Sequence, residues 1–469
     1  ERGRARRWRS LAPPALTVAG AALVGTLAAV QPQFAVALVG GGLLLALPFV
    51  APVAHLLLLI LVTAIVPFDL QNALGFGGGP DSPGLLPSDV LLLGGLGRAA
   101  LVLLDAPLDR RRRWALTLVA GFLVVAGLQL VHGLRAGSDP GISGAELRVL
   151  LGLGAAVIAM PILADPRLRE RFFRGLVGVG LAVGMWGLAQ WTVDIPFTAA
   201  EDAGVREGVR FTSAGRGQIQ GGLFAFPVAI VMGVAGLMSH EVRSVGARTL
   251  LVAVVGLNSV DLVLTYERTF WLATLLALVV LALRASPQQR LRALTLGPAL
   301  LAVALAGMAI LLPRDLAAAR ERLVSVGSYG TDLSVRYRVN ESRHVIREIR
   351  AEPLLGSGLG ATILWGRAYE GVRPETESFA HNGYLWLAWK LGGPATALVL
   401  LLLGCALLSR GPPKPATAAG AIRGGAQAAL LLLLVASITF PAFEALGITA
   451  VMGVLIALCF PGVPRESTA

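Results

Sequence analysis

Residues 383–407 read GYLWLAWKLGGPATALVLLLLGCAL, and this stretch contains a single charged residue, Lys390. About 20 consecutive apolar residues are enough for a helix to cross the hydrocarbon core of a bilayer. The stretch therefore predicts a transmembrane helix. Comparable segments occur at 11–30, 34–50, 52–68, 87–104, 115–133, 146–163, 175–193, 219–238, 248–265, 268–285, 294–312, 424–441 and 444–461. We expect an all-α, polytopic membrane protein with about 12–14 transmembrane helices.

The composition agrees with this fold class. The 469 residues are 55% hydrophobic and only 14% charged, whereas soluble domains carry about 25% charged residues. The apolar residues form continuous runs, unlike the alternating pattern of a membrane β-barrel. Both cysteines, Cys405 and Cys459, lie in apolar segments, so neither a disulfide framework nor a cysteine metal site is expected.

The net charge of +12 comes mainly from arginine. In a membrane protein, this charge indicates orientation and contact with anionic lipid before nucleic acid. By the positive-inside rule, the basic short loops and both termini are predicted to be cytoplasmic. The apolar run 11–30 is longer than a usual signal-peptide core, and we expect it to remain as the first helix. The basic residues of these loops are Arg110 to Arg113, Arg167, Arg169, Arg171, Arg174, Arg243, Arg248, Arg284, Arg290, Arg292, Arg410, Lys414 and Arg423.

The other loops are assigned to the outward face, and the longest of them covers 313–382. It divides the chain into N-terminal transmembrane helices (1–312), a large outward loop with short helices and catalytic elements (313–382), and C-terminal transmembrane helices (383–469). An amphipathic helix suited to the membrane interface is predicted over 335–350. Its apolar face is formed by Val335, Val339, Ile346 and Ile349.

A glycine-rich turn, PLLGSGLG, follows at 353–360. Gly356 and Gly358 let the backbone turn sharply and approach a ligand or another helix. A flexible loop without a ligand fits the same residues. The turn lacks the lysine of a GxxxxGK[ST] phosphate-binding loop.

His381 and Asn382 stand where the long loop enters the span 383–407. Imidazole can accept a proton from a hydroxyl group at neutral pH, so His381 is a candidate general base. A structural role is the alternative for a lone histidine. Asn382 is a candidate either to orient His381 or to hydrogen-bond a substrate.

Three arginines in other outward loops, Arg210, Arg216 and Arg268, are candidates for anion binding. Guanidinium groups bind phosphate oxygens in a bidentate manner, so several on one face suggest a multiply charged anion. Anchoring to lipid headgroups is the alternative for any one of them.

Three further charged residues lie in or beside apolar segments. Asp261 precedes Arg268 by seven residues and is a candidate partner for it, while Lys390 and Glu444 are candidate buried charges. The sequence has no Asp-x-Asp, HExxH or Cys/His cluster, so neither a metal nor another cofactor is expected. No nucleophile-elbow pattern surrounds the serines of the long loop.

The stretch HNGYLWLAWKLGG from His381 resembles the signature of the O-antigen ligase and polymerase family, in which His-Asn precedes an aromatic-Leu pair, here beginning at Tyr384. EPLLGSGLG at 352–360 is similar to the family's Pro-Leu-x-Gly-x-Gly-x-Gly element. Three arginines match positions where the family has arginine: Arg210 in VRFTSAGRG, Arg268 in LTYERTFWLA, and Arg338. The chain departs from the family pattern at Glu267, usually a small residue, and at Ala395, commonly glycine.

The resemblance implies metal-independent, inverting glycosyl transfer on the outer face of the cytoplasmic membrane. The donor would be a glycan on a polyprenyl diphosphate, typically undecaprenyl, and the acceptor a sugar hydroxyl of lipid A core or of another lipid-linked repeat. His381 would act as the base, and the departing diphosphate would be neutralised by Arg210, Arg268 and Arg338. The residues expected to support this site are Asn382, Arg216, Gly356, Gly358 and Tyr384.

Two other functions remain open. A peptidoglycan-type polymerase usually depends on an outward aspartate, but Asp315 and Asp332 stand in no recognisable motif. A transporter or flippase of lipid-linked sugars would show inverted repeats or broken helices with charges at mid-membrane. Neither is clear in the sequence, although Asp261 and Glu444 are compatible with transport.

Overall fold

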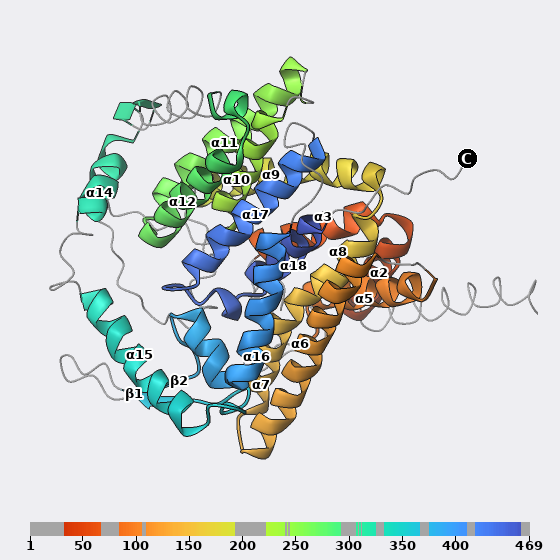
Figure 1. Ribbon diagram of the computed structural model, residues 1–469, viewed down its shortest axis with the longest axis vertical. Helices are drawn as coiled ribbons and strands as arrows, with labels where there is room; N and C mark the ends of the chain where they lie inside the picture. Colours follow the sequence, from red (N-terminus) through yellow and green to blue (C-terminus); the bar gives the residue numbers. More distant parts are fainter. Residues whose placement is uncertain are drawn as a thin grey trace, which may run out of the picture.

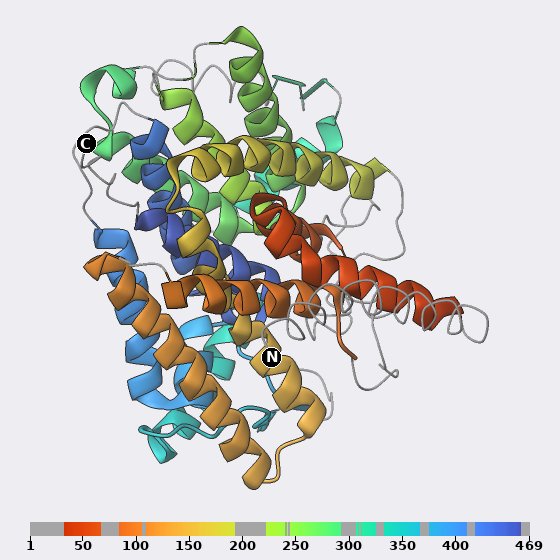
Figure 2. The ribbon, with the colours of Figure 1, turned by 90° about the vertical axis from the view of Figure 1, so that its right-hand side faces the viewer.

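The computed structural model describes residues 32–66, 84–105, 109–192, 222–239, 242, 244–291, 306–307, 309–310, 312–324, 333–365, 375–409 and 418–460. Figures 1 and 2 show a bundle of helices in which α17 and α18 lie centrally. The predicted span 11–30 lies wholly outside the described residues, and the predicted span 294–312 lies largely outside them. Within those residues, the structure is helical apart from one short pair of strands.

The helices confirm the predicted fold class and most of the predicted spans. Several helices start at a proline, which suits the first helical turn because its missing N–H would have no partner there. The helices are α2 (Pro32–Val50), α3 (Pro52–Ile65), α5 (Pro87–Asp105), α6 (Arg110–Arg135), α7 (Pro140–Leu151), α8 (Ala155–Ile162), α9 (Pro166–Thr192), α10 (Ala225–Met238), α11 (Val245–Leu264), α12 (Arg268–Arg284), α14 (Pro313–Val324), α15 (Leu333–Ala351), α16 (Gly383–Leu408), α17 (Ala418–Ala436) and α18 (Leu446–Cys459).

Six helical stretches among the described residues are long and apolar enough to cross a membrane, and five shorter apolar helices accompany them. Large apolar side chains on the outer helices are exposed, for example Leu104, Val124, Leu128 and Leu275. Exposed apolar surface of this extent indicates contact with lipid. The chain is therefore a polytopic helical membrane protein. The six long stretches are Pro87–Leu104, Arg110–Arg135, Pro140–Ile162, Pro166–Thr192, Val245–Leu264 and Gly383–Leu408.

The centre of the bundle is α18, in which every residue from Gly447 to Cys459 is buried. Glycines bring the neighbouring backbone close to it. A Cβ atom on Gly453 would lie 2.8 Å from the backbone nitrogen of Ala156, and one on Gly152 would lie 2.2 Å from Oγ1 of Thr449. Contacts this short are sterically forbidden, so the close packing around α18 depends on glycine.

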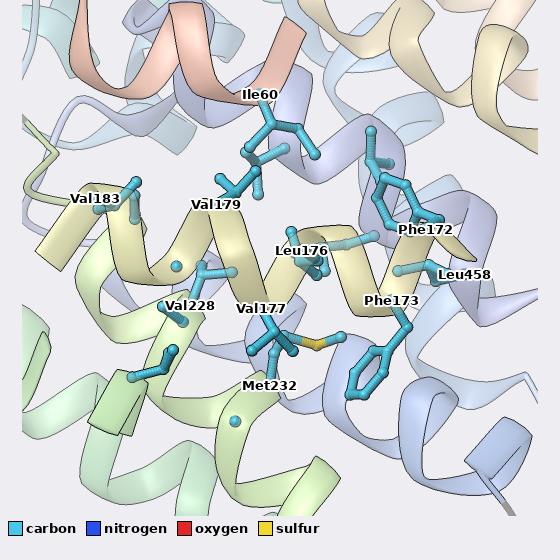
Figure 3. Close-up of a pocket in the computed structure, with 18 of the residues that line it drawn as sticks. Ile60, Phe172, Phe173, Leu176, Val177, Val179, Val183, Val228, Met232 and Leu458 are labelled. Carbon is cyan, nitrogen blue, oxygen red and sulfur yellow. The ribbon is translucent and has the colours of Figure 1, made fainter. Parts of the chain in front are cut away.

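An apolar pocket lies among α3, α9, α10, α11 and α18 (Figure 3). Its lining includes Phe172, Leu176 and Val179 of α9 and Met232 of α10. Among the described residues, the lining consists of apolar side chains and glycines, and none of these residues comes from α15 or α16. The pocket therefore suits a hydrocarbon chain and has no group for acid–base chemistry.

The interval 313–382 holds α14, α15 and the strands β1 (Ile363–Trp365) and β2 (Glu375–Glu377), which pair antiparallel with Leu364 opposite Thr376. The sequence predicted short helices in this loop but did not indicate the strand pair. Figures 1 and 2 place α15, the strand pair and the junction of α6 with α7 at the same end of the molecule.

Helix α15 confirms the predicted helix over 335–350, and its buried residues differ from the apolar face that the sequence indicated. Val339 is 46% exposed, whereas Glu341 and Val345 are buried. The helix packs against α16, and polar contacts of Glu341 with the start of that helix set its orientation. A carboxylate therefore occupies a position that apolar periodicity alone would assign to the surface.

Helix α16 differs from the continuous span predicted at 383–407, because Gly392 (φ 79°, ψ 169°) breaks the helical geometry. The freed backbone groups bond to the glycine-rich turn. Ser357 N–H donates to the carbonyl oxygen of Trp389 (2.8 Å), and Gly393 N–H donates to that of Pro353 (2.8 Å). The kink is therefore stabilised by the turn that packs into it.

The glycine-rich turn approaches two helices, one of the possibilities that its sequence left open. Gly356 and Gly358 have φ angles of 70° and 83°, which disfavour other residues. A Cβ atom on Gly358 would lie 2.6 Å from the nitrogen of Gly133 in α6, and one on Gly356 would lie 2.5 Å from the nitrogen of Gly392. The turn thus joins the loop to α6 and α16.

We predict that Gly358→Ala destabilises the protein by more than about 1 kcal/mol, because the new Cβ atom would meet both a positive φ angle and the α6 backbone. Thermal unfolding in detergent measures the effect. Gly127→Ala is the matched control on α6, since nothing lies within 4 Å of its added Cβ atom, and alanine favours a helix. Equal melting temperatures for Gly358→Ala and the wild type would contradict the prediction.

Candidate functional site

His381 lies against a buried carboxylate that the sequence analysis did not identify. Nδ1 of His381 is 3.0 Å from Oε1 of Glu341 and 3.2 Å from Oε2. The backbone N–H of His381 donates to the same carboxylate at 3.0 Å. The Glu341 side chain is only 1% exposed, whereas that of His381 is 21% exposed. The imidazole thus reaches solvent while its partner is enclosed.

This contact selects one tautomer of the imidazole. An ionised carboxylate only accepts hydrogen bonds, so Nδ1 must carry the proton that it donates to Glu341. In the neutral ring, the lone pair then lies on Nε2. The ring is also packed between aromatic side chains, with centroids 5.8 Å from Tyr337 and 5.3 Å from Phe379. His381 therefore has a fixed orientation and a proton acceptor in Nε2.

A second carboxylate holds the residue before His381. The backbone N–H of Ala380 donates to Oε1 of Glu444 at 3.1 Å. Glu444 belongs to the short turn between α17 and α18, and the sequence had indicated it only as a candidate buried charge compatible with transport. Removal from water raises the pKa of Glu444 well above its ordinary value, and the nearby charges of Glu146 and Glu341 add to the effect. Two carboxylates from separate elements therefore fix the backbone at 380–381.

A third carboxylate anchors the glycine-rich turn. Glu146 of α7 accepts a hydrogen bond from Gly360 N–H at 2.6 Å and forms an ion pair with Lys390 at 2.6 Å. Lys390 is fully buried and also donates to the carbonyl oxygen of Ala361. The prediction that Lys390 is a buried charge is confirmed. Its partner was missed because Glu146 stands at the edge of an apolar span, 244 residues earlier.

The residues that follow His381 have structural contacts. Oδ1 of Asn382 accepts the N–H groups of Tyr384 and Leu385, both at 3.1 Å, and so caps α16. The hydroxyl of Tyr384 donates to the carbonyl oxygen of Leu434 at 2.6 Å. These bonds hold the first turn of α16, which positions His381.

Arg338 lies one turn before Glu341 on α15. Its Nε atom is buried and has no hydrogen-bond partner among the described residues. A buried guanidinium donor without a partner costs free energy, so an anion at this position would be stabilised. Arg338 is thus close in sequence and in helical position to the carboxylate that orients His381.

Arg268 begins α12, and this helix start packs against the turn that also supports His381. Oγ1 of Thr269 is 2.7 Å from Oγ1 of Thr439. Nearby in that turn, the carbonyl oxygen of Ser437 accepts Gly383 N–H at 2.9 Å. The starts of α12 and α16 therefore both form hydrogen bonds with the turn that follows α17. The predicted sites Arg210 and Arg216 lie outside the described residues.

The suggested partnership between Asp261 and Arg268 is wrong. Asp261 is fully buried against Gly187 of α9, and both of its carboxylate oxygens lack a hydrogen-bond partner among the described residues. Asp261 lies within α11, and Arg268 begins the next helix, α12. The turn between them, in which Tyr266 has a φ angle of 55°, separates the two side chains.

These features define a polytopic membrane protein with a carboxylate–histidine pair at the junction of its loop and its helices. A model of the O-antigen ligase family matches residues 251–400. This region contains Arg268, Arg338, Glu341 and His381. Residues 251–400 are thus similar to the O-antigen ligase family, as the motifs predicted. No curated protein sequence matches the chain.

We predict that Lys390→Met destabilises the protein by about 3–5 kcal/mol, because it leaves Glu146 as an unpaired buried charge. Thermal unfolding in detergent is the measurement. The double variant Lys390→Met/Glu146→Gln removes both charges and should recover part of the loss. A double variant less stable than Lys390→Met would show that the loss has another cause.

Proposed function

We propose that the protein transfers a glycan from a polyprenyl diphosphate, with undecaprenyl as the carrier, to a sugar hydroxyl of a lipid-linked or glycan acceptor. The reaction takes place at the outer face of the cytoplasmic membrane. The observation that carries the proposal is the His381 imidazole, whose Nδ1 contacts Glu341 at 3.0 Å, leaving Nε2 as a proton acceptor. The family match over 251–400 supports the reaction class.

The transfer is a displacement at the anomeric carbon. Nε2 of His381 accepts the proton of the acceptor hydroxyl as the hydroxyl oxygen attacks that carbon from the face opposite the diphosphate. The bond between the anomeric carbon and the diphosphate oxygen breaks, and its electron pair stays on the diphosphate. The configuration at the anomeric carbon is therefore inverted, and the imidazolium releases its proton to solvent.

Arginines stabilise the charge that develops on the departing diphosphate. Arg338 supplies a buried Nε donor without a partner among the described residues. Arg268 extends from the start of α12, and the proposal assigns Arg210 and Arg216, which lie outside the described residues, to an outward loop. The donor charge is thereby balanced by guanidinium groups, and the reaction requires no metal ion.

Transport of lipid-linked sugars is favoured less by the described residues. The kink in α16 lies beside the buried Lys390, as a transporter would require. However, the backbone groups at the kink bond to the glycine-rich turn, and Lys390 is paired with Glu146. The backbone groups at the kink and the Lys390 ammonium are therefore already bonded to other parts of the protein.

Reconstituted protein should transfer glycan from a polyprenyl-diphosphate donor in the presence of a chelator, and His381→Ala should abolish the transfer. His381→Gln tests the same loss with a side chain closer in size. His344→Ala is the matched control on α15, because Nδ1 of His344 bonds to the carbonyl oxygen of Asn340 in its own helix. Transfer by both His381 variants would remove His381 as the base, and movement of lipid without transfer would indicate a flippase.

Arg338→Lys should raise KM for the diphosphate donor about tenfold, because lysine cannot reproduce the planar fork of guanidinium. Arg343→Lys on the exposed face of the same helix should leave KM unchanged. Steady-state kinetics with varied donor make the comparison. Equal KM values in the two variants would exclude a donor-binding role for Arg338.

Impermeant maleimide added to intact cells should label Arg347→Cys but not Arg248→Cys. Both positions are exposed, and the positive-inside rule assigns them to opposite faces. The exposed Cys405 is replaced by serine in both variants to remove background labelling. Labelling of Arg248→Cys alone would reverse the proposed orientation.

A further inference from the structure

We infer that Glu341 is the positioning residue of the proposed glycan transfer: its carboxylate holds His381 in the tautomer that acts as base. This inference rests on the proposed function for its catalytic consequence. The orientation of the imidazole itself is a property of the folded protein and can be measured without any substrate.

The carboxylate makes two kinds of contact with the same residue. Oε1 faces Nδ1 of the ring at 3.0 Å, and Oε2 accepts the backbone N–H of His381 at 3.0 Å. Together they fix both the position of the residue and the rotation of its ring. A single contact would fix only one of these.

The Glu341 carboxylate is buried, and burial without hydrogen-bond partners would cost free energy. A carboxylate that is 1% exposed has exchanged its water for protein donors, and burial of such a group is costly unless hydrogen bonds compensate. Among the described residues, the Glu341 carboxylate bonds to the backbone N–H and to Nδ1 of His381, 40 residues later in the chain. The contact with His381 therefore compensates the burial.

The carboxylate also matters during the proton transfer. When Nε2 takes the acceptor proton, the neutral imidazole becomes an imidazolium cation, and the adjacent negative charge stabilises it. A side chain that retained the hydrogen bond but lost the charge would keep the ring near its position and lose this stabilisation. Glutamine is such a side chain.

Helix α15 thereby connects the two functions of the site. Arg338 and Glu341 are three residues apart, so they lie on neighbouring positions of the same helix face. Arg338 presents a buried Nε donor that has no hydrogen-bond partner among the described residues, and Glu341 orients the proposed base. The position of α15 therefore determines where both the Arg338 guanidinium and the Glu341 carboxylate lie.

Glu341→Gln should lower kcat for transfer about 100-fold, the scale of a general-base contribution, with KM for the donor unchanged. Glu348→Gln is the matched control, because it is the same substitution two turns later on the partly buried side of α15, and it should keep the wild-type kcat. An unchanged kcat in Glu341→Gln would overturn the inference. Equal reductions of kcat in Glu341→Gln and Glu348→Gln would do the same.

Nitrogen-15 NMR of histidine-labelled protein tests the orientation directly. The chain has five histidines, and the signal lost in His381→Ala identifies the one concerned. We expect His381 to carry its proton on Nδ1 in the wild type and to lose this preference in Glu341→Leu, whose side chain has no acceptor for that proton. A wild-type proton on Nε2 would overturn the inference. If the wild type transfers no glycan, the proposed function fails, while the NMR result still decides whether Glu341 sets the tautomer.

Discussion

The buried ion pair between Lys390 and Glu146 is the interaction on which the arrangement of the site depends. Lys390 lies two residues before the kink in α16, and Glu146 belongs to α7. Each charge would be very costly alone in this position. Together they bind the glycine-rich turn through Gly360 and Ala361. The pair thus joins one N-terminal helix, the loop and one C-terminal helix at a single point.

The site extends from this point along α16. The kink at Gly392 accepts the glycine-rich turn, and the first turn of the helix, capped by Asn382, carries His381. Helix α15 then lies against the same end and supplies Glu341. Glu444 holds the adjacent backbone from the turn before α18. The His381 imidazole is thereby held by groups from three separate parts of the chain, which is the fixed geometry that the proposed general base would require.

The sequence allowed the fold class and most helix positions to be predicted because apolar runs of spanning length carry a strong, local signal. The kink at Gly392 was missed because hydropathy averages over the whole run. His381 was identified from its place at the mouth of a span. Glu341 was missed because its importance arises from a contact 40 residues away, and a charged residue within an amphipathic helix usually faces solvent.

The separation of 244 residues between Glu146 and Lys390 has a consequence for biosynthesis. Ribosomes add about 5–20 residues per second, so roughly 10–50 seconds pass between the synthesis of the two charges. During that interval the nascent chain holds a carboxylate in an apolar segment without its ammonium partner. An unpaired carboxylate is costly in an apolar environment, so the helix around Glu146 is stabilised by its ion pair only after α16 has been made. A chain that stopped before α16 would keep this carboxylate without its Lys390 partner.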